Sequence, residues 1–255
     1  MPTLPLSVAL ISFNEEANIG RTLQSILRIA SEIIVVDSHS IDSTCEIAEQ
    51  YGAKVFIEDW KGFGQQKQSA LDKCANDWIL FLDCDEVVSS ELLQSISNAI
   101  SGEINSFKLK RKTYYCGKLL EHTWQPDEQL RLVHKSSNPV WKNNIHEYLY
   151  VDAKVETLQG FLIHYTYKNI EDHFLKTITY AQLSAVEYHR KGRKAHWYNL
   201  IINPIIGFIK RYVIELGFLD VIRGFAVAVS AFLYFFLKYL FLWEITNSSK
   251  NYDGN

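Results

Sequence analysis

Two carboxylates spaced two residues apart directly follow a short apolar segment. Asp83 and Asp85 come after residues 78–82, which read Trp-Ile-Leu-Phe-Leu. A buried strand that ends in such a pair brings both carboxylates to one edge of a sheet, where they can hold a hard divalent cation with open coordination sites. A diphosphate can fill those sites, and the cation then neutralises charge on the departing phosphate. The plainer alternative is a solvated acidic turn before a helix capped by Ser89 or Ser90.

Polar residues also end two earlier apolar segments. Residues 6–11 lead into Asn14 and Glu16, and residues 33–36 lead into Asp37. An acidic residue at the end of a parallel strand commonly meets the ribose or base of a nucleotide. Two local alternatives stay open, because Asn14 could cap the next helix and Asp37 could close a turn with a nearby serine.

Two basic residues are candidates for contact with phosphate. Lys67 follows the glycine-containing turn 62–64 at the start of a helical segment, and such a turn can approach phosphate closely. Arg131 could bind phosphate through two parallel hydrogen bonds. The alternative for Lys67 is a plain loop that binds no phosphate. The alternative for Arg131 is a surface salt bridge.

Strands and helices must alternate to bring these side chains to one edge of a sheet. The strand-like segments are 6–11, 33–36, 54–57 and 78–82, and the helical segments between them are 19–27, 41–51 and 64–74. This alternation is typical of βαβ units. It predicts an α/β, Rossmann-like, mostly parallel sheet with helices on both faces, within a domain of residues 1–165.

Short strand-like pieces between 106 and 164 lead to a helix that Asn169 should cap. Its predicted apolar face consists of Ile170, Phe174, Ile178, Ala181, Ala185 and Tyr188.

The segment 200–243 is apolar and rich in aromatic residues. Within it, 225–243 has 19 residues with Lys238 as the only charge, which is near the minimum for a membrane span. Residues 168–244 contain 10 Lys and Arg against 6 Asp and Glu, a balance that fits docking onto an anionic leaflet. A spanning helix, and apolar helices in the interface or on the core, both stay open. We expect a helical, membrane-associating extension over 166–245 and a flexible tail over 246–255.

The composition excludes several classes of protein. With 255 residues, 47% hydrophobic and 22% charged, the chain is not disordered, collagen-like or coiled-coil. The net charge of −3 predicts no nucleic-acid partner. Four cysteines without zinc spacing indicate reduced thiols in a cytosolic compartment. The N-terminus predicts no cleaved signal peptide.

Together these motifs resemble glycosyltransferase family 2, of GT-A fold. The resemblance is carried by residues 7–16, 34–38 and 83–85, and it extends over about residues 5–243. It is closer still to the lipopolysaccharide-core branch of heptose β-1,4-glucosyltransferases. That closer likeness comes from residues 60–67, 131–133, 145–147, 217–220 and 236–239. His39, Ile41 and Cys84 depart from the branch, which usually has Gly, Thr and Ala there.

The resemblance implies inverting transfer of a sugar from a nucleotide donor, usually UDP-linked, with Mg²⁺ or Mn²⁺. By the same match, Asn14 and Glu16 would lie near the nucleotide, and Asp37 would meet the uracil or ribose. Asp83 would lie near the ribose or the metal, and Asp85 would hold the metal.

Inversion in one displacement requires a general base that takes the proton of the acceptor hydroxyl. The candidates are Asp127, Glu128 and Glu147, and the sequence favours Glu147 slightly over Asp127. His146 could be a further metal or diphosphate ligand, or simply structural. The sequence does not decide among these roles.

The function implied is transfer of glucose from UDP-glucose onto a lipid-anchored glycan acceptor, an inner-core sugar of lipopolysaccharide or a related cell-envelope glycan. The enzyme would lie on the cytoplasmic face of the inner membrane, as a peripheral or monotopic protein. A polyprenyl-phosphate acceptor and a non-catalytic membrane-docked scaffold are alternatives. A haloacid-dehalogenase-like phosphatase is another, because residues 83–87 fit its DxDx[TV] pattern. That class carries the motif in its first strand, whereas here it follows the fourth.

Overall fold

The chain forms two compact units in the computed structural model, which describes residues 3–143 and 147–252, with side chains as far as 247. The first unit comprises Met1–Lys112 and Pro126–Tyr165, and the second comprises Thr113–Gln125 and Thr166–Asn255. Segment Thr113–Gln125 thus groups with the second unit, although it lies inside the residue range expected for the first domain.

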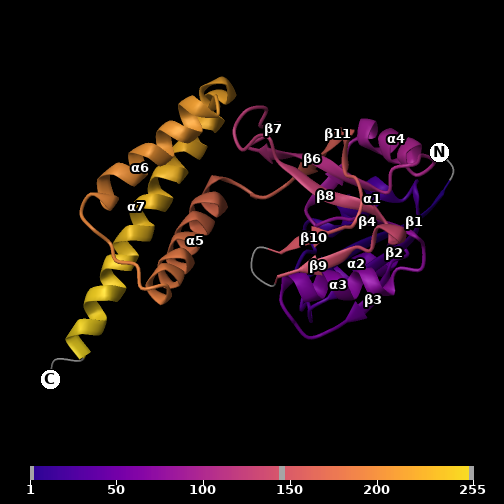
Figure 1. Cartoon of the computed structure of the whole chain (residues 1–255), viewed down its shortest axis with the longest axis horizontal. Helices are drawn as coiled ribbons and strands as arrows, with labels where there is room; N and C mark the ends of the chain where they lie inside the picture. Colours follow the sequence, from indigo (N-terminus) through magenta and orange to yellow (C-terminus); the bar gives the residue numbers. More distant parts are fainter. Residues whose placement is uncertain (1–2, 144–146, 253–255) are drawn as a thin grey trace. The chain divides into compact units, whose positions relative to one another are not determined.

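A mixed sheet forms the centre of the first unit (Figure 1). Over the described residues its strand order is β3-β2-β1-β4-β8-β6-β11-β5. The strands are β1 (Leu4–Ser12), β2 (Ala30–Asp37), β3 (Lys54–Ile57), β4 (Trp78–Phe81), β5 (Glu86–Val88), β6 (Ser106–Tyr115), β8 (Glu128–His134) and β11 (Glu156–His164). Smaller strands are β7 (Lys118–Leu119), which pairs with β6, and β9 (Val140–Lys142) and β10 (Tyr148–Tyr150), which pair with each other.

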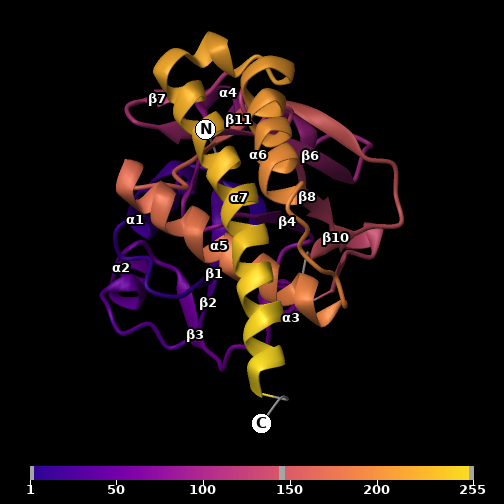
Figure 2. The ribbon, with the colours of Figure 1, turned by 90° about the vertical axis from the view of Figure 1, so that its left-hand side faces the viewer.

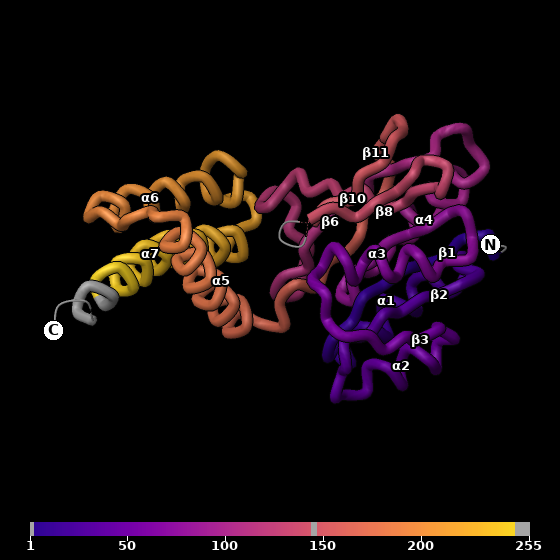
Figure 3. Tube along the Cα trace, turned by 60° about the horizontal axis from the view of Figure 1, so that its bottom comes forward, coloured from indigo at the N-terminus to yellow at the C-terminus, as the bar shows by residue number. Residues whose placement is uncertain are grey.

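Parallel and antiparallel pairings divide this sheet. Strands β3, β2, β1 and β4 pair in parallel, and Figure 3 shows β1, β2 and β3 side by side. Strand β8 then pairs antiparallel with both β4 and β6, and β11 pairs antiparallel with β5. The carboxyl ends of the four parallel strands therefore share one edge, as the sequence predicted.

Helices cover both faces of the sheet. They are α1 (Ile19–Ile26), α2 (Thr44–Gln50), α3 (Phe63–Lys73) and α4 (Ser90–Ala99). Side chains of a strand alternate between faces, so Val8 and Leu10 pack in one core cluster with residues of α1, α2 and α4. Ala9 packs in the opposite cluster with residues of α3. The predicted placement of helices on both faces is confirmed.

In the first unit, one cap considered from the sequence is present, another is not, and one helix begins later than expected. The Ser89 side chain accepts a hydrogen bond from the Leu92 N–H and caps α4, so Ser89 is the cap of the two residues considered, Ser89 and Ser90. Asn14 does not cap α1, because that helix begins only at Ile19. Helix α2 begins at Thr44, so Ile41, expected to be helical, lies instead in the preceding loop and is 92% exposed.

The second unit consists mainly of helices. These are α5 (Ile170–Arg190), α6 (Asn199–Ile209), the π-helical η2 (Lys210–Ile214), the 3₁₀ turn η3 (Gly217–Asp220) and α7 (Val221–Tyr252). Helix α7 runs alongside both α5 and α6 (Figures 1 and 2). The side chain of Asp220 ties segment Thr113–Gln125 to this unit, because its carboxylate accepts hydrogen bonds from the backbone N–H groups of residues 121, 122 and 123.

The predicted cap of α5 is confirmed, but the predicted apolar face is wrong in part. The Asn169 side chain accepts a hydrogen bond from the Asp172 N–H. The buried residues of the helix are His173, Thr177, Ala181 and Ala185. Ile170 and Ile178, expected inside, are 53% and 39% exposed. The spacing of apolar residues in α5 is compatible with two overlapping helix faces. Packing against α7 buries the face that carries Ala181 and Ala185.

Burial of His173 generates a prediction about pH. Its ring is 1% exposed, and Nδ1 lies 2.9 Å from the Tyr115 hydroxyl oxygen. Burial lowers the pKa of His173 from 6.5 to about 4. Between these values the folded protein keeps the ring neutral while the unfolded chain binds a proton, so the free energy of unfolding falls as pH falls from 6.5 toward 4.

Protonation of His173 in the unfolded chain should lower the free energy of unfolding by about 2 kcal/mol at pH 5 relative to pH 7. We therefore expect the wild-type protein to lose more stability between pH 7 and pH 5 than His173→Gln, because the variant lacks the titrating ring. Denaturant unfolding followed by circular dichroism at both pH values measures the two losses. Equal losses would show that His173 does not couple folding to pH.

Candidate active site

A buried arginine compensates the carboxylates at the end of β4. Arg131 is 4% exposed, and its Nη2 atom lies 2.5 Å from Asp83 Oδ2 and 3.1 Å from Glu86 Oε1. The antiparallel pairing of β8 with β4, in which Leu132 lies opposite Leu80, brings Arg131 to this strand end. One guanidinium is thereby shared between two acidic side chains.

Arg111 of β6 extends this network. Its Nη1 atom lies 3.2 Å from Glu86 Oε1, and its Nε atom lies 2.7 Å from Asp127 Oδ2. Burial alone would raise the pKa of Asp83, but Arg131, Lys67 and Arg111 outweigh it and hold that pKa below its usual range. Burial raises the pKa of Glu86, and the nearby Asp83 adds to this effect against the two arginines. Asp83 therefore carries the firmly ionised carboxylate of the pair.

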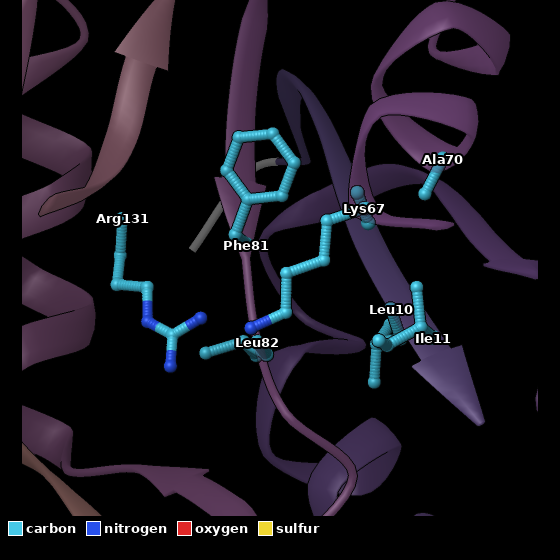
Figure 4. A pocket seen from close by; sticks show the side chains of 8 residues that line it. Leu10, Ile11, Lys67, Ala70, Phe81, Leu82 and Arg131 are labelled. Carbon is cyan, nitrogen blue, oxygen red and sulfur yellow. The ribbon is translucent and has the colours of Figure 1, made fainter. Parts of the chain in front are cut away.

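Lys67 joins Asp83 to Glu147. Its Nζ atom lies 3.2 Å from Asp83 Oδ1 and 3.1 Å from Glu147 Oε1, and it lies 4.9 Å from the centre of the Trp141 ring. Figure 4 shows the side chains of Lys67 and Arg131 reaching from opposite sides toward Leu82, next to Asp83. Two cations thus hold Asp83 in place, and one of them also holds a predicted general base.

Gly64, in the first turn of α3, makes this contact possible. A Cβ atom on Gly64 would lie 2.1 Å from the backbone oxygen of Asn143, closer than any side chain allows. Because glycine has no Cβ, the backbone near Asn143 can lie against α3 and bring Glu147 within reach of Lys67. The glycine motif is therefore required for close packing, whatever its relation to phosphate.

These side chains line a cavity of about 370 Å³, a size typical of small-molecule sites. Its walls are charged, with two aromatic rings. They are formed by Lys67, Asp83, Lys108, Arg111, Gln129, Leu130, Arg131, Trp141, Glu147, Tyr148 and Leu149. The arrangement can accept a proton from a hydroxyl group at a carboxylate while nearby cations stabilise an anionic leaving group.

The two main candidates for the general base differ in their surroundings. Among the described residues, Glu147 lines the cavity and Asp127 does not. Asp127 Oδ2 accepts a hydrogen bond from Arg111, and Oδ1 accepts one from Gln129 at 2.9 Å. Asp127 therefore has both carboxylate oxygens engaged by its neighbours.

Asp85 lies beside a histidine that the sequence analysis gave no role. Its Oδ2 atom is 3.2 Å from His164 Nε2, and both side chains are partly buried. Strand β11 ends at His164, which pairs in register with Glu86 of β5. The only sequence signal was a histidine at the end of a predicted strand, far from Asp85 along the chain.

Asp37 closes a buried turn at the end of β2. It is fully buried and accepts hydrogen bonds from the Ser12 hydroxyl at 2.7 Å and from the Ser40 hydroxyl at 2.6 Å. It also accepts the backbone N–H of Ser40 at 2.7 Å. The local turn considered from the sequence is therefore present, and it joins the ends of β1 and β2.

Asn14 and Glu16 hold the next part of the same edge. Asn14 Oδ1 accepts the N–H of Ile41 at 2.9 Å, and Glu16 Oε2 accepts the N–H of Ser43 at 3.1 Å. His39, which stands where the resembling branch usually has glycine, adopts a left-handed φ of 61°. These contacts order the loops at the carboxyl ends of the parallel strands.

The described residues contain no group of three or more His, Cys, Asp and Glu side chains that could together hold a metal ion. Asp85 and His164 supply an oxygen and a nitrogen at one place. His146, a predicted metal contact, lies outside the residues that the structure describes.

Residues 7–149 match the family model for glycosyl transferase family 2. The chain belongs to this family. The enzyme is thus a glycosyltransferase, and the mixed α/β fold with helices on both faces agrees with the GT-A expectation. The alternative of a haloacid-dehalogenase-like phosphatase is wrong, because its short acidic pattern lies inside the matched glycosyltransferase region.

Several relatives match this glycosyltransferase over most of its length. The lipopolysaccharide core biosynthesis glycosyltransferase LpsC of Rhizobium meliloti (strain 1021) is 29% identical over 251 residues, covering 93% of this chain and 91% of the relative. An uncharacterized glycosyltransferase of Rickettsia typhi is 29% identical over 260 residues, covering 96% and 89%.

Solved structures show weaker likeness. S. aureus TarS 1-349 in complex with UDP-GlcNAc is 15% identical with a TM-score of 0.49, covering 98% of this chain and 92% of that one. Glucosyl-3-phosphoglycerate synthase from Mycobacterium tuberculosis, in complex with Mn²⁺, UDP and glucosyl-3-phosphoglycerate, is 28% identical with a TM-score of 0.36. It covers 44% of each chain.

The shared guanidinium generates a prediction about stability. Arg131→Met should leave the buried Glu86 and the partly buried Asp83 without their nearest guanidinium, with only Arg111 still near both. We expect the free energy of unfolding to fall by about 3–5 kcal/mol, as when one partner of a buried ion pair is removed. Denaturant unfolding measures this change.

The matched control is the double variant Arg131→Met/Glu86→Gln, which also removes one of the stranded charges. It should recover part of the lost stability. A single variant as stable as the wild type would show that Arg131 is not the compensating charge.

Proposed function

We propose that this glycosyltransferase moves glucose from UDP-glucose onto an inner-core sugar of lipopolysaccharide, with inversion at the anomeric carbon. One observation carries the proposal: a cation-held Asp83 and an Asp85–His164 pair stand at the same strand end, beside the cavity that holds Glu147. Similarity to LpsC over nearly the whole chain supports a lipopolysaccharide-core acceptor.

The donor nucleotide is proposed to lie along the carboxyl ends of β1 and β2, since parallel sheets bind ligands beyond these ends. Asn14 and Glu16 order the loop that the nucleotide would meet. Asp37, itself buried, would act by holding closed the turn that meets the uracil or ribose. Lys67 and Arg131 would add positive charge on the diphosphate side.

The residues present fit a hard divalent cation, Mg²⁺ or Mn²⁺. Asp85 and His164 would hold it: the carboxylate suits either ion, and the imidazole nitrogen, a softer ligand, favours Mn²⁺ over Mg²⁺. Asp83 is a weaker choice, since Lys67 and Arg131 already engage both of its oxygens. When bound, the cation would neutralise negative charge on the leaving diphosphate.

Glu147 is proposed as the general base. It would take the proton of the acceptor hydroxyl while that oxygen bonds to the anomeric carbon and the bond from this carbon to the diphosphate oxygen breaks. Lys67 fixes the position of Glu147 from the donor side. Asp127 is assigned a structural role, because Arg111 and Gln129 hold its carboxylate.

The acceptor glycan is lipid-anchored in this proposal, which places the enzyme at the cytoplasmic face of the inner membrane. Within the described part of the chain, one helical stretch, Gly217–Asn247, is long and apolar enough to cross a membrane.

Loss of either proposed metal ligand should abolish the effect of metal on nucleotide binding. We expect Mn²⁺ to tighten UDP binding by the wild type, and Asp85→Asn and His164→Gln to lose this gain by at least about tenfold. Isothermal titration with and without Mn²⁺ measures it. The matched control Asp152→Asn changes an exposed carboxylate of the same unit and should behave as wild type.

Circular dichroism should show the same folded content for all these variants. Undiminished dependence on Mn²⁺ in both Asp85→Asn and His164→Gln would contradict this metal assignment.

The two base candidates are separated by turnover. Glu147→Gln should lower kcat by roughly 10²–10⁴-fold, because the general base is lost, with little change in the Kd for UDP. Asp127→Asn should affect kcat far less and stability more. Release of UDP from UDP-glucose, with truncated lipopolysaccharide core as acceptor, measures both.

Near-normal turnover of Glu147→Gln together with an inactive Asp127→Asn would assign the base to Asp127 instead. Glucose transferred to a polyprenyl phosphate in place of the core oligosaccharide would contradict the proposed acceptor.

A further inference from the structure

Helix α6 presents an uncovered face of isoleucine side chains. Pro204 and Gly207 are its buried positions. The exposed residues recur at helical spacing and are between 43% and 56% exposed: Ile201, Ile202, Ile205, Ile206 and Ile209. An amphipathic helix normally turns such a face toward an apolar partner.

The same exposure continues through the turns after α6. Further large apolar residues that remain exposed there are Val213, Ile214, Leu216, Phe218, Leu219, Val221 and Ile222. A run of large exposed apolar side chains this long is typical of contact with another protein or a membrane. We call the exposed residues of 201–222 the docking surface.

Positive charge and an aromatic residue stand directly before the docking surface. Arg190, Lys191, Arg193 and Lys194 occupy the end of α5 and the following loop. Lys191 forms an ion pair with Glu187, in which Nζ lies 2.5 Å from Oε1. Trp197 then follows and is 75% exposed. Basic residues, an exposed tryptophan and an apolar helix in succession are the features that bind an anionic lipid surface.

Helix α7 packs against α5 along part of its length. The Ser184 and Tyr234 hydroxyl oxygens are 2.8 Å apart, and Lys238 Nζ lies 4.5 Å from the centre of the Tyr188 ring. These contacts show that α5 and α7 run in the same direction side by side. Lys238 is 4% exposed, so the charge in the apolar stretch of α7 faces protein.

This packing argues against a membrane-spanning α7. Helix α5 carries solvent-exposed charges at Lys176 and Glu187, whose side chains are 41% and 43% exposed. At 1.5 Å per residue they are about 16 Å apart along the helix axis. The hydrocarbon core of a bilayer is about 30 Å thick. The contacts of Ser184 with Tyr234 and of Tyr188 with Lys238 bring Lys176 and Glu187 to about the level of residues 226 and 237 of α7. Both charges would therefore enter hydrocarbon if 225–243 crossed the bilayer with α5 attached.

We propose that the second unit docks onto an anionic phospholipid leaflet through the docking surface, and that α7 does not cross the bilayer. This inference deepens the membrane placement within the proposed function and rests on it for the side of the membrane. Its test uses no sugar donor, so its failure is distinguishable from failure of the transferase proposal.

The first experiment is flotation of the full chain with vesicles. Wild-type protein should bind phosphatidylglycerol-containing vesicles, and added salt should weaken the binding. Ile202→Asn/Ile206→Asn should bind about tenfold or more weakly, because two apolar side chains are lost from the membrane contact. The matched control Ile41→Asn changes an exposed isoleucine of the first unit and should bind as wild type.

Undiminished flotation of the double variant would overturn the assignment of the docking surface. So would a wild-type dimer in light scattering that the double variant loses while vesicle binding persists, because the surface would then join two copies of the chain.

The second experiment locates the C-terminus. An epitope tag after Asn255 should be digested by protease in inverted membrane vesicles together with the first unit, since both would lie on the same side. Protection of the tag, with digestion of the first unit, would overturn the docked arrangement in favour of a spanning α7.

Discussion

A guanidinium buried between two carboxylates governs the geometry of the candidate site. Arg131 binds Asp83 and Glu86 at once, at the point where β4 ends and the chain turns back. Removing two carboxylates from water is unfavourable unless a cation compensates them. With Asp83 fixed in this way, Lys67 can bind it and Glu147 together. The position of the proposed base, Glu147, therefore depends on the pairing of Arg131 with Asp83, in which Glu147 itself takes no part.

The two aspartates of the Asp-x-Asp motif have different surroundings. Asp83 faces arginine and lysine, so its charge is already compensated by the protein. Asp85 lies beside His164. This difference supports a division in which Asp83 organises the cationic wall of the cavity and Asp85 meets the metal. The sequence motif alone, two aspartates with one residue between them, does not reveal that Asp83 and Asp85 have different roles.

The sequence predicted the parts of the fold that depend on local pattern. Apolar runs gave the parallel strands, and a cap residue gave the start of α5, because these signals lie within a few residues of their effect. Contacts between distant segments could not be predicted in this way. The pairing of Asp85 with His164 depends on β11 lying beside β5, and no local pattern encodes that register. The buried face of α5 was likewise decided by its neighbour.

The central claim is that Asp85 and His164 together hold the cation that accompanies the donor. A crystal structure with UDP and Mn²⁺, recorded near the manganese absorption edge, tests it most directly. The account predicts an anomalous peak about 2.0–2.2 Å from Asp85 oxygen and His164 nitrogen, with the diphosphate as a further ligand. A peak on Asp83 instead, or bound UDP with manganese absent from Asp85 and His164, would contradict it.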